Sequence, residues 1–112
     1  AYLETLVDAV SYSSNLFSNT ITFEDALSIL TLDEYKGPQG LALRELYTLW
    51  LNLANDALIS NTVIDLGDLS TAGTVGEAIL ECEQIMLEPG NSARDFLIVL
   101  RICQEINAGR YE

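Results

Sequence analysis

Apolar side chains recur at helical spacing along most of the chain, and the longest such stretch runs from Pro38 to Asn61. Wound at about 100° per residue, this stretch gathers its polar side chains into about one-third of its circumference. A helix at a protein surface normally carries only one apolar stripe. We therefore predict a central helix over residues 38–59 that the rest of the chain covers on more than one side.

Two amphipathic helices are predicted before this central helix. Residues 1–18 carry apolar side chains at intervals of three and four, with the polar residues elsewhere. Thr22, followed three positions later by Asp25, is typical of an N-cap, and it opens a second predicted helix from Phe23 to about Leu32. We expect one further turn over residues 33–36, closed by Gly37.

The pattern becomes irregular over residues 62–73, where glycines interrupt a few apolar residues. We interpret this segment as a connection that returns some apolar side chains to the core. Thr74 and Glu77 then match a T-x-x-E capping box, which opens a fourth predicted helix that stops at Pro89.

Ser92 and Asp95 give another cap signal, and the fifth predicted helix ends at Gly109. Because the linker between the fourth and fifth helices is short, we expect them to form an antiparallel hairpin. The pattern as a whole predicts an all-α, five-helix bundle in a single domain, residues 1–112.

The charge balance narrows the classes of partner. The chain has 17 acidic and 5 basic residues, for a formal net charge of -12. Nucleic acid binding requires clustered cations, so we predict no nucleic-acid partner. No uninterrupted apolar run reaches the length of a bilayer span, so we also predict no transmembrane segment.

Cys82 and Cys103 both fall on the inward stripes of the two helices predicted to form the hairpin. Counted from a turn near Gly90, their positions differ along the axis by about 7 Å. A disulfide tolerates Cα separations only up to about 6.8 Å, so a bridge requires an asymmetric turn or tilted helices. The sequence leaves a disulfide and two buried free thiols as alternatives. With no histidine in the chain, a zinc site is disfavoured.

Acidic residues supply the other candidate sites. Asp65 and Asp68 offer loop oxygen ligands for calcium, but they lack the EF-hand spacing, so capping of the loop is favoured. Three glutamates, with Glu83 nearby, are expected to form an acidic face on the fourth helix: Glu77, Glu81 and Glu88. Such a face is either a contact surface for a partner or simply solvated.

No catalytic constellation stands out. Without histidine there is no Ser-His-Asp or Cys-His pair, and no phosphate-binding or dinucleotide fingerprint occurs. We therefore predict a protein that is not an enzyme and has no cofactor. Trp50 and Tyr47 are expected to act as large packing residues of the central helix.

Three strings carry a resemblance: GLALRELYTLWLNLANDA, GTVGEAILECEQIM and EINAG. Together, over about Gly40 to Gly109, they resemble a helical region found near the C-terminal end of many large secreted or cell-surface proteins of bacteria and archaea. The best-defined part is Leu51 to Ala54, although Leu49 and Trp50 stand where small residues are commoner. The resemblance implies an extracellular structural module, with no catalytic residues to carry over.

These observations favour a non-catalytic helical structural or interaction module of an exported or cell-surface protein. Its partner would be another protein or a neighbouring domain of the same parent protein. The alternative is a small acidic binding protein for a basic protein partner or for calcium. A second copy of the chain covering the wide apolar surface of the central helix is a third hypothesis, so the oligomeric state stays open.

Overall fold

The structure is a computed structural model that describes residues 2–32 and 37–110. In chain order its elements are α1 (Tyr2–Ser13), α2 (Phe23–Leu30), α3 (Gly37–Ala54), a 3-10 turn η1 (Gly67–Leu69), α4 (Val75–Leu87) and α5 (Ala93–Asn107). Five α-helices and no strand lie within these two ranges, which confirms the predicted all-α class. The further turn predicted for residues 33–36 lies outside the described residues.

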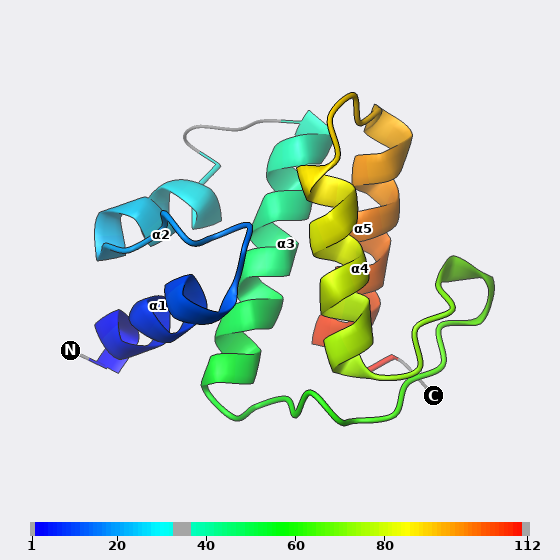
Figure 1. Cartoon of the computed structure of the whole chain (residues 1–112), viewed down its shortest axis with the longest axis horizontal. Helices are drawn as coiled ribbons and strands as arrows, with labels where there is room; N and C mark the ends of the chain where they lie inside the picture. The colour runs from blue at the N-terminus through cyan, green and yellow to red at the C-terminus, as the bar shows by residue number, and fades with distance from the viewer. Residues whose placement is uncertain (1, 33–36, 111–112) are drawn as a thin grey trace.

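Figure 1 shows α3 in the middle of the molecule, with α1 and α2 on one side and α4 and α5 on the other. α3 contacts α1, α2 and α5, and its contact with α5 is the most extensive in the fold. The buried hydrophobic side chains form one cluster to which all five helices contribute. The two-thirds apolar circumference of the α3 sequence is thus used to pack against helices on both sides.

α1 ends at Ser13, five residues before the predicted end of the first helix. The reason is Ser14, which is buried and whose hydroxyl accepts a hydrogen bond from the backbone N–H of Phe17 at 3.0 Å. This turn buries the Phe17 ring edge-on against Tyr47 of α3, with ring centroids 4.9 Å apart. At α2, Thr22 and Asp25 form the reciprocal capping box, which confirms the predicted N-terminus.

α3 stops at Ala54 instead of the predicted Ile59. Asp56 adopts the left-handed conformation, with φ of 59°. The Ala57 N–H donates to Asn52 O at 2.9 Å, and the Asp56 N–H donates to Leu53 O at 3.2 Å. These two bonds make a Schellman motif, which closes the helix without a glycine.

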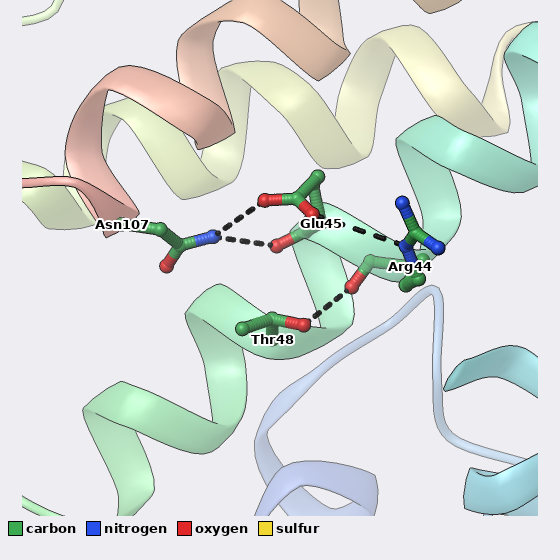
Figure 2. Close-up of polar contacts among 4 residues, drawn as sticks. All are labelled: Arg44, Glu45, Thr48 and Asn107. Carbon is green, nitrogen blue, oxygen red and sulfur yellow. Dashed lines mark hydrogen bonds and ion pairs between the residues drawn. The ribbon is translucent and has the colours of Figure 1, made fainter. Parts of the chain in front are cut away.

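Polar side chains tie the end of α5 to α3, as Figure 2 shows. Asn107 Nδ2 donates to Glu45 O at 3.1 Å and to Glu45 Oε1 at 3.3 Å. Asn107 Oδ1 accepts from Asn52 Nδ2 at 3.0 Å. Nearby on α3, Thr48 Oγ1 donates to Arg44 O at 2.8 Å, and Arg44 pairs with Glu45 at 3.9 Å. The Asn107 bonds hold the two longest helices in register at that end.

The segment between α3 and α4 is irregular, as predicted. It returns to the core through Ile64, which is buried, and through partly buried Leu66 and Leu69. An isolated antiparallel bridge joins Val63, near the middle of the segment, to Thr74 at its end. The segment therefore fixes where α4 begins.

α4 and α5 contact each other and are joined by the short turn 88–92, in which Gly90 has a positive φ of 82°. Ser92 and Asp95 form a reciprocal capping box at the start of α5, where the sequence predicted a helix cap. Among the described helices, none is both long and apolar enough to cross a membrane.

Candidate functional site

The start of α4 is fixed by its cap. The Thr74 hydroxyl accepts from Glu77 N at 3.2 Å, which confirms Thr74 as the N-cap. The Glu77 carboxylate does not return to the Thr74 N–H as a capping box would require. It accepts instead from Gly73 N, one residue earlier, at 2.8 Å. Both contacts orient the first turn of α4 and leave Glu77 exposed to solvent.

One side of α4 faces solvent along the whole helix. We call this side the α4 outer face; it consists of Glu77, Leu80, Glu81, Gln84, Leu87 and Glu88. Their spacing of three and four places them on one side of a helix. All are exposed except Glu81, which is half-buried. The three glutamates predicted to share a face therefore lie on the same side of one helix.

Two leucines lie among these glutamates. Leu80 is 58% exposed and Leu87 is 52% exposed, seven residues apart, which corresponds to about two turns. The sequence reasoning placed neither of them in the acidic face. A signal was available, because Leu80 and Leu87 fall outside the inward stripe formed by Val75, Ile79 and Cys82.

A cleft of about 390 Å³ continues the α4 outer face toward the turn that leads to α5. Three of its lining residues carry carboxylates: Glu81, Glu88 and Asp95. Asp95 is held there by its capping box with Ser92, and Glu81 Oε1 accepts from Ser70 Oγ at 2.6 Å. Asn91 closes the end of the cleft by donating from Nδ2 to Ile85 O. The cleft thus offers negative charge on positioned side chains.

Glu83 does not belong to this acidic face, contrary to the sequence-based expectation. It is 4% exposed and points into the molecule. Its carboxylate accepts hydrogen bonds from Ser14 Oγ and from Trp50 Nε1, the latter at 3.0 Å. Glu83 follows Ile79 by four residues and so lies on the inward stripe, which is why the helix buries it. Its role is to connect α4 to α3 and to the residue that follows α1.

Cys82 and Cys103 meet across the α4–α5 contact. Both side chains are fully buried, and their sulfur atoms lie 4.0 Å apart as free thiols. The axial offset that restricted a disulfide in the sequence analysis is smaller between the sulfur atoms, because Cα–Cβ bonds tilt toward the N-terminus of each helix. Cys82 leans away from the turn and Cys103 leans toward it, so the two side chains converge.

The environment of the cysteines suppresses their reactivity. Cys103 donates a hydrogen bond to Cys82, and this bond together with burial raises the pKa of the Cys103 thiol well above its usual range. Since the thiolate is the reactive form, Cys103 is unreactive while the helices stay packed, and burial keeps solutes away from both thiols.

Asp65 and Asp68, the candidate calcium ligands, are exposed; Asp65 precedes the turn η1 and Asp68 lies within it. Asp65 Oδ1 accepts from Gly67 N at 2.9 Å, a loop-capping contact of the kind that the sequence favoured. Nowhere in residues 2–32 and 37–110 do three or more histidine, cysteine, aspartate or glutamate side chains gather where they could hold a metal ion. Calcium binding by this loop stays a prediction without further support.

A second cleft, of about 530 Å³, was not anticipated from the sequence. It lies between α2, α3 and the connection that joins α1 to α2, and its polar lining includes Asn19, Asp25, Ser28 and Gln39. These residues belong to separate segments, so no local pattern could have identified the cleft.

Comparison with known proteins gives no assignment, since no family model, no curated protein and no solved structure matches this chain.

Proposed function

We propose that this chain is a non-catalytic helical interaction module of an exported or cell-surface protein, and that its α4 outer face binds a basic segment of a protein partner. The proposal rests on one observation in particular. Leu80 and Leu87 are each more than half exposed, two turns apart, and are bordered by the carboxylates of Glu77, Glu81 and Glu88. Apolar anchors at this spacing are what an amphipathic helix presents to a partner.

The charge distribution supports a basic partner. The protein carries a net charge of -12, so its field attracts cations and repels acidic proteins. Close to the leucines, the cleft formed by Glu81, Glu88 and Asp95 offers oxygen acceptors for a lysine or arginine side chain. The matching segment would combine two apolar side chains with flanking cations.

Two synthetic helical peptides test this recognition. The first carries leucines at positions i and i+7 on a background of lysine and alanine, and the second replaces every lysine with glutamate. We expect the protein to bind the lysine peptide, and to bind it on the order of tenfold more weakly when NaCl is raised from about 50 mM to about 200 mM. Isothermal titration calorimetry measures both affinities.

Matched variants locate the site. Leu80→Ser with Leu87→Ser removes the anchors, whereas Leu97→Ser changes a leucine of similar exposure, 47%, on α5. We expect the double variant to lose binding and Leu97→Ser to keep it. The proposed site is wrong if the Leu97 variant loses as much affinity as the double variant.

Charge variants provide the second control. Glu77→Gln with Glu88→Gln lowers the net negative charge by two on the face. Asp65→Asn with Asp68→Asn makes the same change away from it. We expect only the Glu77→Gln, Glu88→Gln variant to bind the lysine peptide more weakly and with a smaller dependence on salt concentration. Equal effects of the two pairs would indicate general attraction to an acidic molecule in place of a defined surface.

The export part of the proposal is supported by the resemblance to a region of large secreted and cell-surface proteins and by the scarcity of lysine in the sequence. It is tested on intact cells that produce the native parent protein. Externally added protease should remove the epitope of an antibody raised against this chain. An epitope that is degraded only after lysis would contradict export.

A further inference from the structure

The α4–α5 contact contains the only two cysteines of the sequence. Their sulfur atoms lie 4.0 Å apart, which is van der Waals contact, and neither side chain is exposed. Their neighbours on the two helices are apolar, among them Ala78, Ile79 and Val99. The chain has no histidine that could activate a thiol or complete a zinc site. The chemistry left to such a pair is oxidation to a bond between its two members.

The two sulfur atoms already face each other at 4.0 Å. A disulfide requires them to approach by about 2 Å, through rotation of the side chains and a shift of the helices. The opposite lean of the two side chains along antiparallel helices already brings the sulfurs together. The two cysteines are 21 positions apart, so the cross-link closes one helical hairpin and leaves the rest of the topology unchanged.

We propose that Cys82 and Cys103 are oxidised to an intramolecular disulfide when the chain folds in an oxidising compartment. The oxidant is a small-molecule disulfide such as oxidised glutathione. The thiolate of one cysteine attacks it, releases one glutathione thiol and forms a mixed disulfide. The thiolate of the other cysteine then attacks the protein sulfur of that mixed disulfide and releases the second glutathione thiol. Two protein thiols are oxidised, each losing its proton, and one small disulfide is reduced.

Burial determines when this exchange occurs. In the folded protein both sulfur atoms are buried away from a dissolved oxidant, and the hydrogen bond from Cys103 to Cys82 together with burial disfavours the Cys103 thiolate. Oxidation therefore takes place while the hairpin is still forming or after it opens. Once formed, the disulfide is shielded from reductants by the same packing. The inference is independent of the proposed binding face, because the thiols lie on the opposite side of α4.

The first experiment compares oxidation of the thiols during refolding with their oxidation in the folded protein. Reduced protein is unfolded in guanidinium chloride and refolded in a buffer of reduced and oxidised glutathione. A second sample is placed in that buffer without unfolding. Thiols are then counted after denaturation, and mass spectrometry measures the intact chain. We expect the refolded sample to lose both thiols and two hydrogens as a monomer, and the native sample to react much more slowly.

Two outcomes would overturn the proposal: both thiols still free after oxidative refolding, or disulfides found only between chains. Cys82→Ala and Cys103→Ala each retain one thiol and serve as controls that cannot form the intramolecular bond. If either variant lost its thiol within a monomer to anything other than glutathione, the assignment of the pair would be wrong.

The second experiment measures the consequence for stability. Closing a loop of this length is expected to raise the thermal midpoint on the order of 10 °C above that of the reduced protein. The Cys82→Ala, Cys103→Ala double variant should have the same midpoint in both buffers. A midpoint that is equal or lower after oxidation would contradict a disulfide compatible with this fold. Binding of the lysine peptide is expected to be the same in both redox forms.

Discussion

Glu83 links three parts of the chain: α4, on which it lies, α3 and the residue that follows α1. Its side chain is 4% exposed, and its carboxylate accepts hydrogen bonds from Ser14 Oγ and Trp50 Nε1. We expect Glu83→Ala to lower the free energy of unfolding by roughly 2–4 kcal/mol, since it leaves one buried donor, Ser14, and one partly buried donor, Trp50, without this acceptor and opens a cavity. Urea unfolding followed by circular dichroism measures the loss.

The neighbouring residue provides the control for that prediction. Gln84→Ala changes an exposed side chain on the same turn and should alter stability by no more than about 0.5 kcal/mol. Glu83→Gln keeps the shape and one acceptor oxygen, so its loss should fall between the two. Equal unfolding curves for Glu83→Ala and Gln84→Ala would refute the structural role assigned to Glu83.

Tyr47 carries a buried hydroxyl that has no hydrogen-bond partner in the part of the chain that the structure describes. Burial, aided by the charge of Asp25, raises the pKa of Tyr47 to about 12. The phenol of an unfolded chain ionises near pH 10.0, so below that pH the ionisation of Tyr47 does not change the free energy of unfolding. Above pH 10 the unfolded chain loses this proton first, so the free energy of unfolding falls as the pH rises toward the folded-state pKa.

Tyr47→Phe is therefore expected to be as stable as the parent, or more stable by roughly 1 kcal/mol, at neutral pH. Its stability should also fall less steeply above pH 10, as measured by urea midpoints at a series of pH values. Tyr12→Phe, at a side chain that is 94% exposed, should leave the pH profile unchanged. If the two variants give the same alkaline profile as the parent, the hydroxyl of Tyr47 does not behave as a buried group.

At the scale of the elements, helix ends separate what a sequence predicts well from what it predicts poorly. Starts marked by Thr22, Thr74 and Ser92 were predictable because each cap is a local contact over three residues. The end of α3 was missed because Asp56 takes the left-handed role that a glycine usually signals. The apolar pattern continues past it to Ile59 and hides the stop.

The same feature gives a prediction for α3. Asp56→Gly relieves a side chain held at φ of 59° and should raise the free energy of unfolding by about 0.5–1 kcal/mol. Gly109 closes α5 with the same pair of bonds and a φ of 76°, so Gly109→Ala should be destabilising by about 1 kcal/mol. Thermal unfolding of both variants checks the two signs. A destabilised Asp56→Gly would show that the carboxylate contributes more than the strain costs.

The whole molecule is dominated by its negative charge. The structure records two ion pairs in the described residues, Arg44 with Glu45 and Arg110 with Glu105, against a net charge of -12. We expect raising NaCl from about 20 mM to about 200 mM to increase the thermal midpoint on the order of 3 °C, since salt screens the self-repulsion. The Glu77→Gln, Glu88→Gln variant should gain less. A midpoint insensitive to salt would contradict net repulsion in the folded state.

Patterns that extend along the whole chain predicted part of the fold and part of the candidate site. Periodicity and caps predicted the helix order, the irregular connection and the position of three glutamates on one face of α4. They could not predict the contacts of Glu83, because its partners lie 69 and 33 positions away in the chain. The exposed Leu80 and Leu87 were missed for a different reason: their positions outside the inward stripe were visible in the sequence but were not used to place them in the acidic face.

The bond between Trp50 and Glu83 has a practical consequence. Trp50 is the only tryptophan in the chain, so the intrinsic fluorescence excited at its indole band comes from a single position. Its N–H is held by the residue that lies between Leu80 and Leu87 along α4 but faces inward. Indole emission responds to the polarity and hydrogen bonding around the ring. A partner that displaces α4 would thus shift the emission of the unlabelled protein, whereas one that docks without moving the helix would leave the spectrum as it is.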